Sequence, residues 1–302
     1  MLRPVVAGLD GSSESLAAAH WAAREALRRG LPLRLVHAWE GLPDTAGSAG
    51  LPEVRVPQSR ARRMLRDTVG ELAASYPRLD LSSEQVHRQP GPALLDEAAH
   101  AELLVIGSQG LGAVGGFVLG SVAMVTAVHA ERPVVLVRAG ESAGSEHLPD
   151  VSGRPSTRTA HRDVAVAVDT DGPCDDVLDF AFRAAELRGA PLRVVHAWHV
   201  PLSHGLPDAR TRGAFRRQAE RELAALLEPW RQKFPAVYVA ATLHEGRPAH
   251  VLPRAVSGAG LLVVGRRRRH PAIGAHAGPV THALVHHVTR PVALVPHDDR
   301  PG

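Results

Sequence analysis

The sequence is short of cysteine, lysine and long apolar runs, and each shortage excludes a class of protein. Cys174 is the only cysteine among 302 residues, so no internal disulfide can form and a reducing compartment is the simplest setting. No apolar run reaches the ~18–20 residues that cross a bilayer, and residues 1–6 lack a signal-peptide pattern. We therefore expect a cytoplasmic protein with no membrane-spanning helix.

The scarcity of lysine explains the high pI of about 10.1. Lys233 is the only lysine, so arginine carries nearly all of the positive charge, yet the formal net charge is only +4. Because arginine keeps its proton, it raises the pI without creating a strong positive field at neutral pH. Nucleic acid is therefore not an expected partner.

What the sequence does have is one unit written twice. The first copies of four apolar segments are residues 5–10, 33–39, 103–107 and 132–137, and the second copies are residues 164–169, 192–198, 261–265 and 290–295. The constant offset indicates duplication of a whole domain. We expect a first domain at residues 1–139, a linker rich in Gly, Ser, Pro and charge at 140–161, and a second domain at 162–297.

Within each copy, short apolar runs alternate with helical patterns. The runs are unbroken and β-branched, as in parallel strands covered on both faces. After the first run, apolar residues recur at helical spacing from Leu16 to Leu27, with Ser12 or Ser13 available as the N-cap. The third strand, at 81–87 and at 237–243, has the weakest pattern. This alternation predicts a doubly wound parallel α/β sheet in each copy.

A glycine-rich segment after the fourth strand is the best candidate for a binding site. Residues 107–121 hold six glycines, and a helix is predicted from about residue 122 to 130. Glycine lets a ligand approach the backbone, and the free N–H groups at a helix start favour an anion. Ser121 can cap that helix or donate its hydroxyl to a phosphate. The alternative is a flexible loop without a ligand.

Two familiar phosphate motifs do not account for this segment. A P-loop requires Lys and Ser or Thr after its last glycine, and Gly112 is followed by Ala113-Val114. Gly110, Gly112 and Gly115 match the dinucleotide fingerprint, but that fingerprint belongs after the first strand of its fold. We interpret the match as a consequence of glycine richness.

The spacing Gly-x2-Gly-x9-Gly-Ser at Gly107, Gly110, Gly120 and Ser121 has a better counterpart. With the opening strand that ends in Asp10, it resembles the universal stress protein family, specifically its tandem-domain, ATP-binding branch. The resemblance covers both halves outside the linker. It implies two tandem doubly wound parallel five-stranded sheets of strand order 3-2-1-4-5, an adenine nucleotide alpha hydrolase-like fold.

The resemblance also implies a site, with ATP as its ligand, alone or with magnesium. It assigns the Asp10 carboxylate to the nucleoside and the Ala38 backbone to the adenine edge; a helix cap is the alternative role for Asp10. Gln109 stands where many relatives have a basic residue. The residues expected at the nucleotide are Gly8, Asp10, Ala38, Gly107, Ser108, Gly110, Gly120, Ser121 and Val122.

The second copy departs from this pattern. Asp169, Gly265 and Gly278 are kept, but Arg268 stands at the second glycine position and Pro279 at the serine. Arginine disfavours positive φ, and proline removes an N–H and the hydroxyl, so we expect weak or different nucleotide binding. Alternatively, the four arginines of residues 266–269 bind phosphates through side-chain charge. They also resemble a nucleic-acid tract, although a solvated loop is the simpler interpretation.

Other residues suggest chemistry less strongly. His282 and His286 have metal-chelating spacing, but no carboxylate or cysteine accompanies them, so no metal site is predicted. His37 and His196 end predicted strands and are expected to be hydrogen-bonded core residues. Cys174 lies near a helix start, which can lower a thiol pKa, yet no partner base accompanies it.

The sequence therefore predicts a nucleotide-binding regulator and shows no recognisable catalytic set. The resemblance implies a role in stress or dormancy, exerted through conformation or an unidentified protein partner. It also implies antiparallel pairing of residues 134–137 with 292–295, which makes the chain an internal pseudo-dimer that can assemble further as a homodimer. The alternatives are a slow ATP hydrolase, a nucleotide-dependent ligase of related fold, or a scaffold without a ligand.

Overall fold

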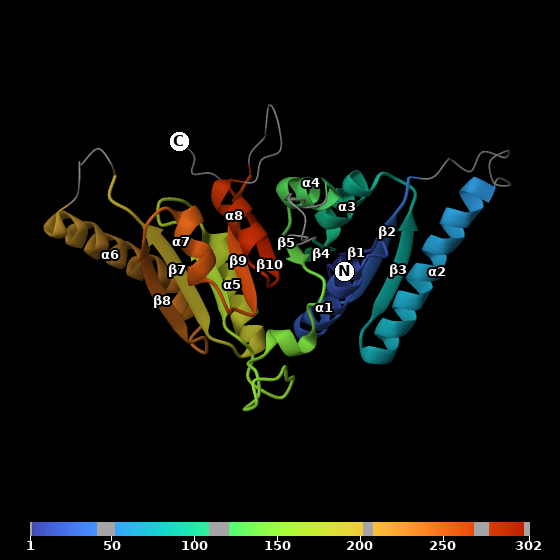
Figure 1. Cartoon of the computed structure of the whole chain (residues 1–302), viewed down its shortest axis with the longest axis horizontal. Helices are drawn as coiled ribbons and strands as arrows, with labels where there is room; N and C mark the ends of the chain where they lie inside the picture. Colours follow the sequence, from blue (N-terminus) through green and yellow to red (C-terminus); the bar gives the residue numbers. More distant parts are fainter. Residues whose placement is uncertain (1, 41–51, 109–120, 202–207, 269–277, 299–302) are drawn as a thin grey trace. The chain divides into compact units, whose positions relative to one another are not determined.

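The chain folds into two compact α/β units, residues 1–143 and residues 144–302, in a computed structural model (Figure 1). The structure describes residues 2–40, 52–108, 121–201, 208–268 and 278–298. Each unit contains one parallel sheet with helices on both of its faces.

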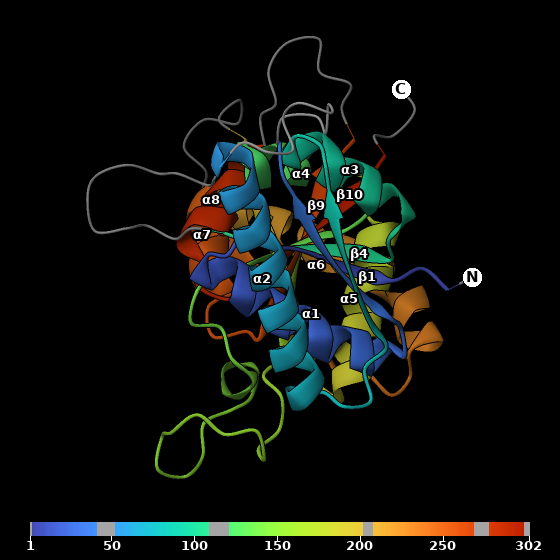
Figure 2. The same ribbon diagram turned by 90° about the vertical axis from the view of Figure 1, so that its right-hand side faces the viewer.

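The first unit has strand order β3-β2-β1-β4-β5, and all of its strand pairs are parallel. Helices α1 and α2, whose ribbons cross in Figure 2, cover one face of the sheet, and α3 and α4 cover the other. The strands are β1 (Val5–Gly8), β2 (Leu33–Ala38), β3 (Leu81–Val86), β4 (Leu103–Gly107) and β5 (Val134–Val137). The helices are α1 (Ser13–Arg29), α2 (Pro52–Ser75), α3 (Pro90–His100) and α4 (Ser121–His129).

The second unit repeats this order as β8-β7-β6-β9-β10, again with parallel pairs throughout. Helices α5 and α6 share one face, and α7 and α8 share the other. The strands are β6 (Val164–Val168), β7 (Leu192–Trp198), β8 (Val239–Glu245), β9 (Leu261–Arg267) and β10 (Val292–His297). The helices are α5 (Asp175–Arg188), α6 (Ala209–Lys233), α7 (Pro248–Ala255) and α8 (Pro279–His287). The expected order 3-2-1-4-5 is confirmed in both units.

Helix α1 shows how the sequence builds these layers. Ser12 is its N-cap, as one of the two expected serines, and accepts the Ser15 N–H. The buried face consists mainly of alanines around Trp21, so the helix axis can approach the sheet closely. The helix ends at Gly30, whose φ of 64° is the left-handed conformation that favours glycine.

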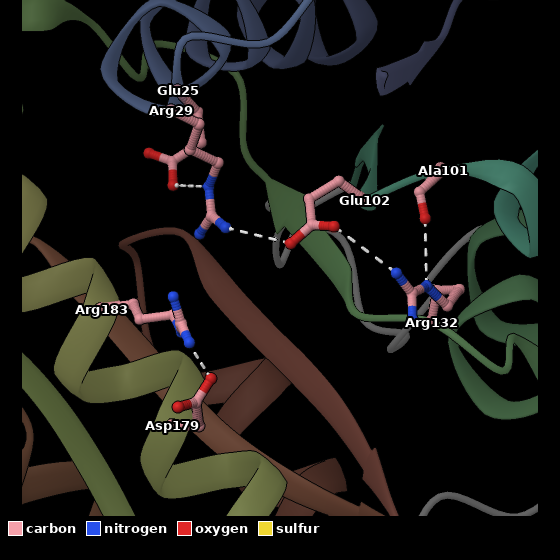
Figure 3. Close-up of polar contacts among 7 residues, drawn as sticks. All are labelled: Glu25, Arg29, Ala101, Glu102, Arg132, Asp179 and Arg183. Carbon is pink, nitrogen blue, oxygen red and sulfur yellow. Dashed lines mark hydrogen bonds and ion pairs between the residues drawn. The ribbon is translucent and has the colours of Figure 1, made fainter. Parts of the chain in front are cut away.

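A cluster of ion pairs joins the C-terminal turn of α1 to the amino ends of β4 and β5 (Figure 3). Arg29 Nε donates to the buried Glu25 carboxylate at 2.8 Å, and its Nη1 lies 3.7 Å from Glu102. Arg132 Nη2 lies 3.5 Å from Glu102, and its Nε donates to the Ala101 carbonyl at 3.0 Å. These contacts support the unit at the sheet edge opposite the carboxyl ends of its strands.

The segment expected as a linker has regular structure of its own. A 3-10 helix spans Ala143–Glu146, and His147 and His161 form an antiparallel bridge. Arg290 also donates to the Ser145 carbonyl at 3.1 Å. Residues 144–161 thus group with the second unit, because their backbone groups find partners there. The pairing of the two units through their last strands stays a prediction.

Candidate functional site

The candidate site lies where β1 and β4 end side by side in the first unit. From β1 the chain crosses to β2 on one side, whereas β4 lies on the other, so this edge is the switch point of the sheet. Gly8 and Gly107 end the two strands, and Ala38 ends β2 beside them. Ser108 is buried, and its N–H donates to the Val137 carbonyl at 2.8 Å.

Asp10 lies in a tight turn between β1 and α1. Gly11 has a φ of 85°, a conformation that favours glycine, and it returns the chain so that Ser12 meets Asp10. The Ser12 N–H and hydroxyl both donate to Asp10 Oδ1, at 2.9 and 2.6 Å. Partial desolvation raises the pKa of Asp10, but the hydrogen bonds from the Ser12 side chain and backbone, with further ones from the Ser15 side chain and the Asp10 backbone, together outweigh it and lower the pKa. Asp10 is thus a surface carboxylate that is held ionised, and the helix cap is Ser12.

Gly107 is glycine for a reason that the sequence alone does not reveal. A Cβ atom there would lie 2.7 Å from both the Glu14 carbonyl carbon and the Ser15 nitrogen of α1. These are backbone atoms, which cannot rotate away, so only glycine lets β4 pass the start of α1. This contact places the beginning of the glycine-rich segment directly against the helix that follows Asp10.

Histidines tie the ends of the central strands together in both units. His37 Nδ1 lies 2.8 Å from the Leu9 carbonyl, and His196 Nδ1 lies 3.1 Å from the Val168 carbonyl. The expected hydrogen bonds of these two histidines are confirmed, and His196 is buried in the core as expected, whereas His37 is only partly buried. Because His37 precedes Ala38, this bond fixes the end of β2 next to the Asp10 turn.

The structure brings five of the expected site residues together and leaves two undescribed. Gly8, Asp10, Ala38, Gly107 and Ser108 follow or end the adjacent strands β2, β1 and β4. Ser121 and Val122 open α4. Gly110 and Gly120 lie outside the described residues.

In the second unit the corresponding aspartate has a different setting. Asp169 Oδ1 accepts the Asp171 N–H at 3.2 Å, and Asp169 Oδ2 lies 3.9 Å from an Arg267 nitrogen. Residues 170–174 separate Asp169 from α5, whereas only Gly11 and Ser12 separate Asp10 from α1. In the described part of the chain, the second aspartate thus has the Asp171 backbone N–H where Asp10 has Ser12, and it faces the Arg267 side chain.

The expectation that Arg266 and Arg267 lie in a loop is wrong. The pairing of β4 with β5 ends at Gly107. The pairing of β9 with β10 continues past the corresponding Gly265 for two more residues, Arg266 and Arg267. Arg266 is buried, and this desolvation, with the nearby Arg268 charge, lowers its pKa to about 10. Arg268 donates through its side chain to Asp298 at 3.1 Å. In this extended strand Arg266 can bury the aliphatic part of its side chain.

Gly265 is the last residue of the segment that β9 shares with β4, and Gly278 precedes α8. A Cβ atom on Gly265 would lie 2.9 Å from the His297 ring, a side chain rather than the helix backbone met at Gly107. Gly278 lies just before Pro279, the first residue of α8. The side chain of Pro279 is not described.

The remaining candidate residues have plain roles. Burial, with the charges of Asp175 and Asp169, raises the pKa of the Cys174 thiol to about 11, so the suggestion that a helix start lowers it is wrong. His282 is exposed, and the side chain of His286 is not described. Over the described ranges, no three His, Cys, Asp or Glu side chains form a group that could hold a metal.

A parallel sheet with an ionised aspartate and a glycine-rich segment at its switch point defines a class: the doubly wound α/β proteins that bind ligands at this edge. Comparison with known proteins narrows the class. The profile of the Universal stress protein family matches residues 1–138 and 161–296. The chain belongs to the universal stress protein family.

The chain matches its relatives along nearly their whole length. Universal stress protein Rv2005c of Mycobacterium tuberculosis is 32% identical over 299 residues, 96% of each chain. Universal stress protein Rv2623 of the same organism is 30% identical, with 96% of this chain and 95% of that protein covered. A universal stress protein structure from Archaeoglobus fulgidus has a TM-score of 0.64 at 14% identity, covering 97% of this chain and 98% of that one. That structure shares the fold.

None of the helices in the described ranges is both long and apolar enough to cross a membrane.

The four arginines of α2 at positions 60, 62, 63 and 66 are exposed, which is typical of a solvated helix face.

Proposed function

We propose that the first unit binds an adenine nucleotide, ATP, at the carboxyl ends of β1 and β4. The observation that carries this proposal is the Asp10 carboxylate, held ionised by Ser12 at the switch point of the sheet. A fixed carboxylate accepts hydrogen bonds from a nucleoside, while the glycine-rich segment supplies backbone N–H groups for phosphates. Family membership supports this assignment of the two parts.

We further propose that the second unit binds nucleotide weakly or not at all. Arg267 faces Asp169, and the β9–β10 extension occupies the stretch of chain that in the first unit leads into the glycine-rich segment. Since both members of the Arg267–Asp169 pair are about half exposed, the pair itself contributes little stability. The stronger obstacle is the backbone, which at Arg266 and Arg267 is committed to strand pairing and offers no phosphate cradle.

The output of binding, in this proposal, is a change of conformation or of protein partner in a cytoplasmic stress response. Rapid hydrolysis requires a base that activates water and a metal near the γ-phosphate. The described acid at this edge, Asp10, is engaged by Ser12, and we assign it to the nucleoside. Magnesium, where it takes part, would accompany the phosphates. Pairing of the units through β5 and β10, and homodimers, belong to the same proposal.

Calorimetric titration with ATP tests the binding proposal. We expect one nucleotide per chain, with binding lost in Gly120→Val and little changed in the matched second-unit variant Arg268→Ala. No heat and no thermal shift at millimolar ATP would leave a scaffold as the better description. Rapid ATP turnover that disappears in Asp10→Asn would favour the enzyme instead.

A further inference from the structure

In the turn that carries Asp10, the hydroxyl of Ser12 contacts both the Asp10 carboxylate and the start of α1. The Ser12 hydroxyl accepts the Ser15 N–H at 3.1 Å from the first turn of α1 and donates to Asp10 Oδ1 at 2.6 Å. Ser15 in turn donates its hydroxyl to the Ser12 carbonyl at 3.0 Å. The hydroxyl thus links the positive end of a 17-residue helix to a single carboxylate oxygen.

Both described hydrogen bonds from Ser12 go to the same carboxylate oxygen. With Oδ1 held by the N–H and the hydroxyl, rotation about the Asp10 side chain is restricted. The two bonds also favour the charged form, which has only acceptors to offer a ligand. An unheld aspartate at the same place would be free to rotate and would gain a proton more readily.

The second unit provides an internal comparison. The residue two positions after its aspartate is Asp171, whose ionised side chain cannot donate a hydrogen bond to Asp169. Among the described residues, the Asp171 backbone N–H donates to Asp169 Oδ1, at the longer distance of 3.2 Å. The serine hydroxyl therefore distinguishes the unit with the glycine-rich segment from the unit without it.

We propose that Ser12 is a positioning residue for nucleotide binding: its hydroxyl orients the Asp10 carboxylate so that Oδ2 accepts a hydrogen bond from the nucleoside. This inference rests on the proposed function. A serine that served only to cap α1 would act through helix stability alone. A serine that positions Asp10 acts on affinity even where the cap is retained.

Three substitutions at Ser12 separate the two roles. Ser12→Asp keeps an N-cap side chain of equal quality but, like Asp171, cannot donate to its neighbour and adds a repelling charge. Ser12→Ala removes both functions, and Ser12→Thr retains both. Ser13 serves as the matched control, because its exposed hydroxyl contacts Glu14 rather than Asp10.

The measurement is the ATP dissociation constant of the full chain at neutral pH, with thermal unfolding to confirm that each variant folds. Because the lost hydrogen bond is one to a charged group, we expect roughly tenfold to hundredfold weaker binding in Ser12→Ala and weaker still in Ser12→Asp. Ser12→Thr and Ser13→Ala are expected to bind within about twofold of the parent, since the Asp10 hydrogen bond is kept. A structural role predicts instead that any loss of affinity in Ser12→Ala follows its loss of thermal stability and does not change with pH.

The pH profile supplies a second readout that helix capping does not affect. Because the Ser12 side chain lowers the pKa of Asp10, its removal raises that pKa. The ratio of variant to parent affinity should then fall further as the pH decreases, since protonated Asp10 accumulates earlier in the variant. Phosphate titration of ATP is common to both proteins and cancels in the ratio.

The outcomes are distinguishable. If the parent binds ATP and both Ser12→Ala and Ser12→Asp bind it as tightly as the parent does, the inference about Ser12 is overturned and the proposed function stands. If the parent binds no ATP at millimolar concentration, the proposed function itself fails, and the inference with it.

Discussion

Replacing Gly107 by alanine is the substitution whose effect the structure specifies most closely. The new methyl carbon would lie 2.7 Å from the backbone of Glu14 and of Ser15, about 1 Å inside an ordinary carbon contact of ~3.5–4.0 Å. Either β4 or the first turn of α1 must therefore move. Overpacking of this kind costs about 1–3 kcal/mol, and we expect a value near the upper limit because backbone atoms cannot rotate away.

The second unit contains the matched control for this prediction. In Gly265→Ala the nearest atoms, at 2.9 Å, belong to the His297 ring, a half-buried side chain that can turn aside. We expect a cost of about 1 kcal/mol or less for this variant. The comparison therefore separates the loss of a glycine from a collision with backbone.

Hydrogen exchange followed by mass spectrometry on the full chain is the suitable assay, because two units need not unfold in one step. Amides in α1 should exchange faster in Gly107→Ala, while those in α5 keep the parent rate. Urea unfolding of both variants gives the corresponding change in midpoint. Unchanged α1 exchange, or equal destabilisation by the two alanines, would refute the close approach of β4 to α1.

Three further predictions concern stability and reactivity. Glu25→Ala should reduce the unfolding free energy by about 3 kcal/mol in urea titrations, because the largely buried Arg28 and Arg29 side chains lose a fully buried carboxylate, although Arg29 keeps Glu102; a loss below about 1 kcal/mol would contradict a buried ion pair. Gly30→Ala should reduce the unfolding free energy by about 1 kcal/mol, because the φ of Gly30 is 64°. Gly70→Ala should instead raise it by about 0.5–1 kcal/mol, because Gly70 lies inside α2 and a Cβ atom there meets nothing within 4 Å. A reversed order of the two melting temperatures would disprove this. With a pKa of about 11, only about one Cys174 thiol in a thousand is ionised at pH 8, so a disulfide reagent should label it far more slowly in the native chain than in urea. Equal labelling rates would show that the thiol is neither buried nor shifted.

The fold was largely predictable because both halves of the sequence contain the same order of strand and helix patterns. Unbroken apolar runs at a constant offset identify the same strands in both halves, and the order of those strands follows from the family resemblance. The N-cap at Ser12 was also predictable from local chemistry alone. The strands and the helix cap depend on short-range pattern, which a sequence displays directly, whereas their order in the sheet does not.

The details of the site depend on neighbours that are distant in sequence, and there the sequence was less informative. The glycine at 107 suggested ligand approach, yet the structure shows that α1 occupies the space beside it. Arg266 and Arg267 suggested a solvated loop, but pairing with β10 extends the strand through them. The position of Cys174 near a helix start suggested a lowered thiol pKa, but burial beside carboxylates raises that pKa instead.

Ser12 is the site residue that sequence reasoning missed. Its position as a helix cap gave it a sufficient structural role, which concealed its bond to Asp10. The signal that could have revealed it is the comparison of the two halves, in which serine at this position corresponds to Asp171. A difference two residues after a shared aspartate is a specific reason to examine the turn.

The number and location of nucleotides bound per chain test the central claim most directly. Native mass spectrometry of the full chain with ATP should show one bound nucleotide, lost in Asp10→Asn and retained in Asp169→Asn. Two nucleotides on the parent chain, or one that survives in Asp10→Asn and disappears in Asp169→Asn, would contradict a single site in the first unit.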